Sequence, residues 1–480
     1  MADALVVGGS FAGLATALAL HGSGYRVRVL ERSGPPPEGP VGRAVPGWHR
    51  PTVPQAVHSH TLTSVGVRVL RHRAPRLLSA ALEAGAELLD LVEALPSPVE
   101  DRAREVGDED LVDLACRRTV LELLLYRAVR DLPQVRIDHG TLVRGLVLDP
   151  ASERVRGVRT DNGDVIPAAV VIDATGRRTE SRGWLTAAGV PVAEDLVQPS
   201  AITGYSRQYR LLGSGRPGPL NRGNAVGGIF DHYAAALHPA DSRTFAVAVM
   251  VPPGDRATDG LRTPGGFTAA ARATPGIGAW LEPGVSEPLT PVNVIACPPN
   301  VLRGTVTTRQ RAVAGLFAVG DAACVTNPLY GRGMSLALDQ AFRLADLLAD
   351  ARVDQDLSGA AARLAERLFT PWYEFSAQED QERTDRWNTA VGDGRPPRSR
   401  PDRPAERTRA ERVRDAALTD GLVWRSLIRV IMGLTTPAEA FGDEKFLARV
   451  DQAPPIDPAL LPQAPSRDEF VRVISKAEGA

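Results

Sequence analysis

The chain has 480 residues, more than a single hydrophobic core usually supports, which predicts two or three packed units. Hydrophobic residues make up 43% and charged residues 24%, as in ordinary soluble globular proteins. The formal net charge of −1 argues against a nucleic-acid-binding protein, because such domains carry a basic excess. Cys116, Cys297 and Cys324 are too few and too scattered to predict a disulfide scaffold or a zinc site.

The amino terminus lacks the pattern of a signal peptide, because Asp3 precedes its apolar stretch and Gly8 and Gly9 interrupt it. No uninterrupted run of about 20 apolar residues occurs in the sequence, so no membrane span is expected. These features predict a cytoplasmic protein.

The first third of the chain begins with a βαβ pattern. An apolar strand is expected over residues 4–7, an alanine- and leucine-rich helix over 11–20 and an alternating strand over 25–30. This order predicts a parallel sheet with helices on its faces. The proline- and glycine-rich stretch 33–54 that follows is too long for a routine connection and is expected to be functional or mobile.

Further elements follow in two groups. A helix is expected over residues 118–131, strands over 135–147, 154–159 and 168–173, and a strand and helix over 315–321 and 334–348. Residues 198–299 show short alternating strands instead, for example 244–251 and 292–297, which indicates a largely antiparallel sheet. The tail beyond Val353 is expected to be helical, with an exposed linker over 392–409.

The turn after the first strand matches the dinucleotide-binding pattern GxGxxG in part. Gly8 and Gly13 keep its first and third glycines, and Ser10 takes the middle place. The glycines allow a tight turn and close helix–strand packing, so that N–H groups at the helix start can reach a pyrophosphate. Glu31 closes the second strand, where an acidic residue accepts hydrogen bonds from a ribose. Structural glycines and a solvated strand end are the alternative explanations.

The distal run GLFAVGDAACVTNPLYGRGMSLALDQA, residues 315–341, resembles the second flavin-binding motif of FAD-dependent aromatic hydroxylases and epoxidases. The resemblance implies that Asp321 contacts the ribityl chain of FAD and that the loop 328–333 passes beside the flavin ring. It also implies that a helix starting near Met334 directs its N–H groups at the pyrimidine edge, where a positive helix end stabilises the anionic reduced flavin.

Two other segments agree with this family. The run VVIDATGRRTESRGWL, residues 170–185, is similar to its middle motif, which lies near the FAD and pyridine-nucleotide sites. Arg118, three residues before Leu121, matches an arginine that contacts the phosphate or adenosine side of FAD, although its neighbour Arg117 is an alternative.

The loop segment 50–62 resembles R-x-x-V-P-Q-x-x-H-x-H-x-L of actinobacterial natural-product monooxygenases, including the polyether epoxidases. Its pair His58 and His60 is an alternative metal site, but no carboxylate, cysteine or third histidine stands nearby in the sequence. We expect both histidines to pack and hydrogen-bond under the flavin loop, and assign neither as a catalytic base. Arg43 and Arg50 are candidates for contact with flavin or pyridine nucleotide.

By this resemblance the fold is α/β and is that of para-hydroxybenzoate hydroxylase. A discontinuous Rossmann-like FAD domain (1–75, 110–185 and 300–350) accompanies an inserted β-rich substrate domain (76–109 and 186–299) and a C-terminal helical region (351–480). The residues expected at FAD are Gly8, Ser10, Phe11, Ala12, Gly13, Glu31, Arg32, Arg50, Arg118, Val143, Asp321, Pro328, Gly331, Gly333 and Met334.

The implied reaction is that of a single-component monooxygenase. NADPH or NADH reduces FAD, O₂ adds to give the flavin C4a-hydroperoxide, and its distal oxygen passes to an electron-rich alkene or ring of a polyketide-like or aromatic substrate. Epoxidation ranks slightly ahead of hydroxylation, and no metal and no catalytic side chain are assigned.

Three alternatives remain. A flavin halogenase is disfavoured because the sequence lacks W-x-W-x-I-P and has lysine only at Lys445 and Lys476 in the tail. A flavin reductase or oxidase of the same fold would carry the same motifs. A flavoprotein in which FAD is only a scaffold, acting as a cyclase or binding protein, would carry them too.

Overall fold

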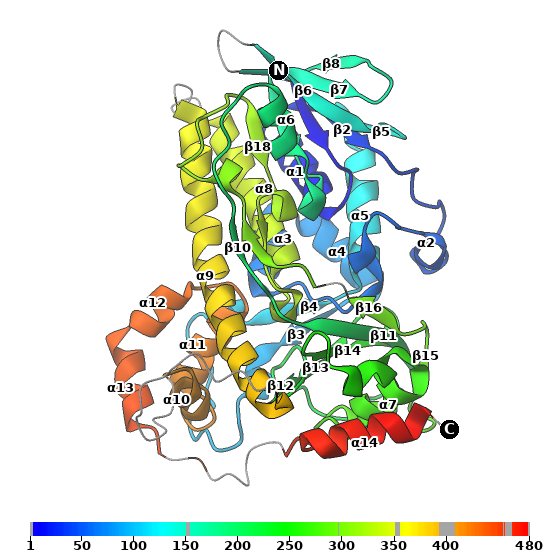
Figure 1. The fold of residues 1–480 in the computed structure, drawn as a ribbon, viewed down its shortest axis with the longest axis vertical. Helices are drawn as coiled ribbons and strands as arrows, with labels where there is room; N and C mark the ends of the chain where they lie inside the picture. The colour runs from blue at the N-terminus through cyan, green and yellow to red at the C-terminus, as the bar shows by residue number, and fades with distance from the viewer. Residues whose placement is uncertain are drawn as a thin grey trace.

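The computed structural model describes residues 3–149, 154–295, 297–350, 356–392, 409–454, 456 and 463–478. A parallel sheet at the top of Figure 1 has the strand order β18-β9-β1-β2-β5. Its strands are β1 (Asp3–Val7), β2 (Arg26–Glu31), β5 (Val135–His139), β9 (Val170–Asp173) and β18 (Leu316–Ala318). The helix between the first two strands is α1 (Phe11–Gly22), so the predicted βαβ unit is confirmed.

Alternation along β1 places side chains on both faces of this sheet. Ala4 and Val6 enter one core, and Leu5 and Val7 enter the other. The first core is closed by α1, α3 (Ser64–Arg73), α4 (Pro75–Glu83), α5 (Arg118–Arg130) and α8 (Gly333–Ala349). The second is closed by α6 (Ser181–Ala187) and by the antiparallel sheet of β6 (Val143–Asp149), β7 (Arg154–Thr160) and β8 (Val165–Pro167).

The strand expected over residues 135–147 is wrong as a single element. It divides into β5, in the parallel sheet, and β6, in the antiparallel one, because the chain leaves the parallel sheet in a turn at Gly140, which has φ of +69°. The stretch 33–54 contains a short helix, α2 (Val41–Gly47). The expected strand 292–297 corresponds to β16 (Asn293–Ile295). Ala296, which belongs to the expected range, lies outside the described residues.

The lower half of Figure 1 holds the predicted antiparallel sheet, in the order β12-β13-β14-β11-β15 with β16 beside β11. Its other strands are β11 (Thr203–Leu211), β12 (Val226–Ile229), β13 (Ala234–Pro239), β14 (Thr244–Val251) and β15 (Ser286–Pro288). Two smaller sheets pair β3 (Glu87–Asp90) with β4 (Val112–Ala115), and β10 (Leu196–Gln198) and β19 (Cys324–Val325) with β17 (Asn300–Leu302).

The carboxyl-terminal part is helical, as expected. The long helix α9 (Leu357–Val391) runs beside both halves of the molecule (Figure 1). Its Trp387 donates a hydrogen bond of 2.8 Å to the carbonyl oxygen of Phe230. Helices α10 (Arg409–Ala416), α11 (Gly421–Ile431), α12 (Pro437–Gly442) and α13 (Glu444–Gln452) form a separate cluster. The predicted linker 392–409 lies, apart from its ends, outside the described residues.

The last helix, α14 (Arg467–Glu478), packs against α7 (Pro264–Ala273) and joins the core of the antiparallel sheet. Phe470 is fully buried there and stacks on Tyr233 with ring centroids 4.2 Å apart.

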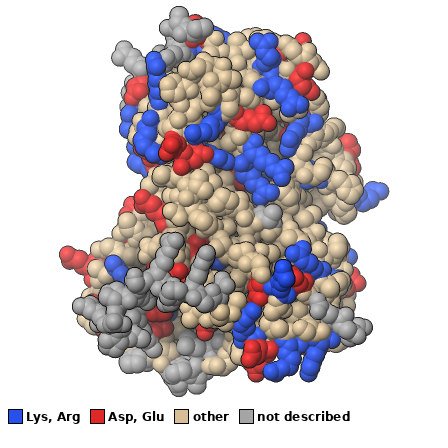
Figure 2. Space-filling view, viewed as in Figure 1, with Lys and Arg blue, Asp and Glu red and all other residues tan. Residues whose placement is uncertain are grey.

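On the face drawn in Figure 2, basic and acidic side chains are interspersed over both halves of the molecule. Within the described ranges, no helix is both long and apolar enough to cross a bilayer.

The packing of α14 can be tested by substituting Phe470 with Ala. Because this ring is fully buried and stacked, we expect its loss to lower the free energy of unfolding by about 3–5 kcal/mol. Urea unfolding measures this change. The exposed substitution Val106→Ala is the control, with an expected effect below about 0.5 kcal/mol. An unchanged midpoint for Phe470→Ala would contradict the packing described.

Candidate functional site

A cavity lies at the carboxyl ends of β1, β9 and β18, the edge of a parallel sheet where nucleotides bind. Its wall combines segments that are far apart in the sequence. The lining residues are Ser10, Phe11, Ala12, Arg32, Thr52, Val53, Pro54, Gln55, Arg118, Ala174, Thr175, Gly176, Arg177, Arg178, Gly320, Asp321, Gly333, Met334 and Ala337.

The glycine turn after β1 delivers the start of α1 to this cavity. Gly8 has φ of +107°, and a Cβ on Gly13 would lie 1.9 Å from the carbonyl oxygen of Gly8, so both positions require glycine. Ser10 precedes the helix but makes no side-chain cap. The first N–H groups of α1 are therefore free of a capping side chain, at a helix end that favours anions.

Glu31 lies at the end of β2 and holds the same turn. Its Oε2 accepts a hydrogen bond of 2.7 Å from the N–H of Gly9, and its Oε1 accepts one of 2.7 Å from the N–H of Ser33. The side chain is buried, with 9% of its surface exposed. Glu31 thus fixes the backbone on either side of the position predicted for a ribose.

Sequence reasoning missed Glu122, a buried carboxylate on α5. Its Oε1 accepts hydrogen bonds from Ser10 Oγ at 2.8 Å and from Arg50 Nη1 at 2.7 Å. Its Oε2 accepts a longer one, 3.3 Å, from Arg118 Nε. The available signal was a single acidic residue in the leucine-rich run 121–125, four positions after Arg118 on a helix.

The two adjacent arginines at the start of α5 point to different partners. Arg118 lines the cavity and reaches Ser10 Oγ at 3.4 Å. Arg117 instead pairs with buried Asp241 of the antiparallel unit, with Nη2 and Oδ2 2.6 Å apart. The geometry therefore favours Arg118 for contact with a ligand.

Asp321 follows β18 and faces the cavity half-buried. Among the described residues none donates a hydrogen bond to its carboxylate. Burial raises the pKa of Asp321 above its usual value, while nearby arginines, Arg118 foremost, oppose the rise. Such a carboxylate is suited to accept hydrogen bonds from ligand hydroxyls.

The middle motif forms the turn after β9. Asp173 is buried and accepts hydrogen bonds from Thr175 Oγ1 at 2.6 Å and from the hydroxyls of Thr179 and Ser181. This carboxylate therefore shapes the turn, while the residues after it, from Ala174 to Arg178, line the cavity.

Several residues expected at the cofactor do not line the cavity. Arg50 lies behind Ser10, paired with Glu122 and stacked 4.4 Å from the Trp48 ring. Val143 is buried in the core under β6–β8. Pro328 and Gly331 lie in the turn before α8, whose first residues, Gly333 and Met334, do line it.

Arg43, considered with Arg50, is exposed on α2 and is not part of the lining. The remaining expected positions, from Gly8 to Gly13 and at Arg32 and Asp321, surround the cavity or support its wall.

The segment 58–61 joins the two halves of the molecule by polar contacts. His58 Nδ1 is 2.8 Å from Ser206 Oγ on β11, and Ser59 Oγ is 3.0 Å from His238 Nδ1 on β13. His60 Nδ1 lies 3.1 Å from the carbonyl oxygen of His58. Burial lowers the pKa of His58 to about 4 and that of His60 to about 3, so both rings are neutral at physiological pH.

Thr61 continues this segment and binds a buried carboxylate. Its Oγ1 lies 2.6 Å from both carboxylate oxygens of Asp113, and Asn224 Nδ2 donates to Asp113 Oδ2 at 2.9 Å. Burial raises the pKa of Asp113 to about 7, against the opposing effect of these hydrogen bonds. Within the ranges described, no group of histidine, cysteine and carboxylate side chains is arranged to hold a metal ion.

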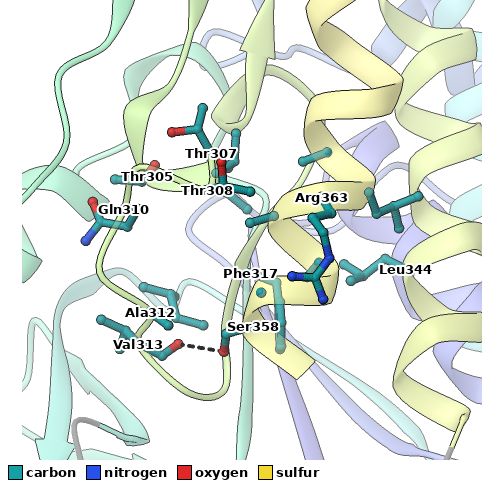
Figure 3. A pocket seen from close by; sticks show the side chains of 18 of the residues that line it. Thr305, Thr307, Thr308, Gln310, Ala312, Val313, Phe317, Leu344, Ser358 and Arg363 are labelled. Atoms are coloured by element: carbon teal, nitrogen blue, oxygen red, sulfur yellow. Dashed lines mark hydrogen bonds between the residues drawn. The ribbon is translucent and has the colours of Figure 1, made fainter. Parts of the chain in front are cut away.

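A second cavity of about 240 Å³ lies between β18 and the start of α9 (Figure 3). Its walls are mostly aliphatic, with threonine hydroxyls and Arg363 among its polar groups. Gln340 lines this second cavity, and Gly320 lines the first. The side chain of Gln340 accepts a hydrogen bond of 2.8 Å from the N–H of Gly320, and this contact separates the two cavities. The second cavity contains no carboxylate and neither glycine turn, so the first cavity is the candidate site.

The buried carboxylate of Asp113 predicts a pH dependence of stability. In the unfolded chain this group loses its proton near pH 4, but in the folded protein only near pH 7. The folded state thus binds more protons between these values, and stability must fall as the pH rises through this window.

We expect Asp113→Asn to remove this contribution. The stability of the wild type relative to the variant should fall by roughly 3 kcal/mol from about pH 5 to about pH 8 in urea unfolding. The exposed change Asp259→Asn serves as control and should leave the pH profile unchanged. A wild-type advantage that grew with pH would show that Asp113 is held ionised instead.

No protein-family model matches the chain. The Mycobacterium tuberculosis protein Rv3254 is 29% identical over 376 residues, which cover 71% of this chain and 72% of that protein.

Solved structures share its architecture. PqsL of Pseudomonas aeruginosa, described as a probable FAD-dependent monooxygenase, has a TM-score of 0.57 at 17% identity, covering 82% of this chain and 98% of PqsL. The Diels-Alderase PyrE3 of pyrroindomycin biosynthesis has a TM-score of 0.58 at 18% identity, covering 91% and 81%. The flavin-dependent brominase Bmp2 has a TM-score of 0.57 at 15% identity, covering 94% and 98%.

Identities this low establish a common fold and leave the reaction open. The predicted α/β architecture, with its Rossmann-like sheet, β-rich insertion and carboxyl-terminal helices, is confirmed. The chain therefore has the fold of the FAD-dependent monooxygenases of the para-hydroxybenzoate hydroxylase type.

Proposed function

We propose that this protein is an FAD-dependent monooxygenase that uses NADPH or NADH and O₂ to epoxidise or hydroxylate a secondary-metabolite substrate. The observation that carries the proposal is the cavity between the starts of α1 and α8, which is lined by Asp321, a carboxylate to which no described residue donates a hydrogen bond. Two helix starts and a carboxylate suit a ligand that is anionic at one end and rich in hydroxyls at the middle.

The residues fit FAD in a definite order. The start of α1, at Ser10 to Ala12, would hold the pyrophosphate, and Glu31 would accept hydrogen bonds from the ribose. Arg118 would neutralise phosphate charge, and Asp321 would accept hydrogen bonds from the ribityl hydroxyls. A Cβ on Gly333 would meet open space, so this position leaves room for a flat ring at the start of α8.

FAD, when bound, would supply hydride acceptance and the activation of O₂. The chain would bind and orient both cofactor and substrate, and the positive start of α8 would stabilise negative charge on the reduced ring. Because burial lowers the pKa of His58 and His60, both rings are neutral and add no charge to the boundary between the parallel-sheet and antiparallel-sheet halves.

We also propose a division into domains from the same reasoning: residues 1–75, 110–185 and 300–350 bind FAD, and 76–109 and 186–299 bind the substrate. Phe470 and Ile474 of α14 belong to the same hydrophobic core as the antiparallel sheet, which supports adding α14 to the substrate domain. The separate helical region would then end before α14.

A non-redox role is the second candidate, because PyrE3 is described as a Diels-Alderase and has the same fold. In that case FAD would only complete the structure. Halogenation is less well supported than this non-redox role, although the brominase Bmp2 has the same fold. The sequence lacks the W-x-W-x-I-P segment and has no lysine outside the tail.

The proposal is tested by supplying the FAD-loaded protein with NADPH and ¹⁸O₂ over a panel of alkene and phenol candidates. We expect substrate-dependent NADPH oxidation and one ¹⁸O atom per product molecule, detected by mass spectrometry. Asp321→Ala should abolish the incorporation, while the surface change Asp259→Asn should not.

NADPH oxidation that yields only hydrogen peroxide across the panel would favour an oxidase. A bound flavin that no nicotinamide reduces, together with a cyclised product, would favour the non-redox alternative and contradict the proposal.

A further inference from the structure

One face of the long helix α9 carries a buried carboxylate whose partners lie in the turn before α8, residues 327–332. Asp380 has 1% of its surface exposed. Its Oδ1 accepts hydrogen bonds of 2.7 Å from Asn327 Nδ2 and of 3.0 Å from the hydroxyl of Tyr330. Burial raises the pKa of Tyr330 well above its usual value, so the phenol keeps its proton and remains a donor. Asp380 therefore binds the turn at two points.

Asn300 of β17 completes the binding of this carboxylate to the turn. Its Nδ2 donates a hydrogen bond of 2.7 Å to Asp380 Oδ2, and its Oδ1 accepts one of 2.7 Å from the N–H of Asn327. The side chain of Asn327 also accepts a hydrogen bond of 2.9 Å from the N–H of Leu329. Because all of these bonds are short and connected, they fix the backbone at the beginning of the turn.

The same helix also holds the end of the turn. Arg332 is buried, and its guanidinium lies over the α9 rings of Trp372 and Phe375, at 4.9 Å and 5.4 Å from their centroids. The ring of Tyr330 lies 4.9 Å from the same guanidinium. Arg332 is the residue immediately before α8, so these cation–π contacts fix the point at which that helix begins.

The charge of Asp380 is balanced within α9. Arg383 Nη2 donates a hydrogen bond of 3.1 Å to Asp380 Oδ1, and the same guanidinium binds the carbonyl oxygens of Ser200 and Ala201. It also stacks on the ring of Trp387 at 4.5 Å. The turn is thus held against a helix that is itself anchored elsewhere in the molecule, and the ion pair leaves little net charge behind it.

The turn directs its polar side chains at α9 and its chain at the first cavity. Asn327, Tyr330 and Arg332 contact α9, and none of these three residues lines that cavity. Gly333 and Met334, which follow directly, do line it. The place of the start of α8 is therefore set from the side of the turn that faces away from the cavity.

From these contacts we propose that Asp380 is a positioning residue, which fixes the turn 327–332 so that the start of α8 lies where it stabilises the reduced flavin. The inference rests on the proposed function, since it requires FAD in the first cavity. A reduced flavin carries negative charge, and the favourable effect of a positive helix end falls off within one turn of the helix. A small displacement of the start of α8 therefore changes the reduction potential of the flavin.

The charge of Asp380 and its hydrogen bonds predict shifts of opposite sign. Asp380→Asn removes a negative charge, which alone would favour the reduced flavin and raise the reduction potential. The amide also has one acceptor oxygen fewer, so it cannot bind Asn300, Asn327 and Tyr330 as the carboxylate does. Loss of these bonds releases the turn and lowers the potential. The sign of the shift therefore separates positioning from an effect of charge.

The reduction potential of the FAD-loaded protein tests the proposal, measured by slow anaerobic reduction against a reference dye. We expect Asp380→Asn to lower the preference for reduced over oxidised flavin at least about 10-fold, which is about 30 mV for a two-electron couple. Tyr330→Phe removes one donor without a change of charge and should lower the potential by less. Glu374→Gln, which removes an exposed carboxylate of the same helix, should leave the potential unchanged.

Hydrogen exchange of the flavin-free protein tests the hold of α9 on the turn without the cofactor. The amides of residues 329–332 should exchange at least about 10-fold faster in Asp380→Asn than in the wild type, and those in the middle of α8 should not change. Faster exchange in both segments would show that Asp380 stabilises the fold as a whole, and would overturn the proposal.

An unchanged or raised potential in Asp380→Asn would also overturn it. If this variant does not fold or does not retain FAD, an unchanged or raised potential in Tyr330→Phe would have the same meaning. Lowered potentials in a protein that oxygenates no substrate would contradict the proposed function and leave this inference standing. A wild type that binds no FAD would overturn both.

Discussion

The candidate site depends on the hydrogen bonds that the buried carboxylate of Glu122 accepts. It binds Ser10 at the glycine turn, Arg50 in the loop after α2 and Arg118 at the start of α5. A carboxylate with 1% exposure is stable only when charged hydrogen-bond donors replace its lost water. Because these donors come from three segments, Glu122 sets the position of the start of α1 relative to Arg118, one of the arginines that line the cavity.

A second polar layer joins the parallel and antiparallel halves. Arg117 pairs with Asp241, and the segment from His58 to Thr61 binds Ser206, His238 and Asp113 in turn. Hydrogen bonds of this kind have narrow geometric tolerance, so they fix the register of the two halves more sharply than apolar contacts do.

The sequence predicted what depends on local pattern. The alternation of β1 and β2, the helix between them and the glycine turn follow from steric rules that act over a few residues. The place of Asp321 at the cavity could also be predicted, because a motif of contiguous residues carries it. The break between β5 and β6 was missed, since a single glycine separates two runs with the same strand-like composition.

Long-range polar partners were beyond prediction. Ser10 and Glu122 are 112 positions apart, and Asp113 and Asn224 are 111 apart, with no motif that links them. Arg50 is an example. Its segment resembles a flavin-binding sequence, but its guanidinium forms an ion pair with Glu122 and does not line the cavity. The attachment of α14 to the antiparallel sheet likewise depends on apolar complementarity between distant segments.

We infer that the cavity at the ends of β1, β9 and β18 holds FAD. Fluorescence titration of the flavin-free protein with FAD, FMN and NADP⁺ tests this inference most directly. We expect one tightly bound FAD per chain, much weaker binding of FMN and NADP⁺, and a large loss of FAD affinity in Asp321→Ala. Binding of NADP⁺ as tight as that of FAD, or FAD affinity unaffected by Asp321→Ala, would contradict it.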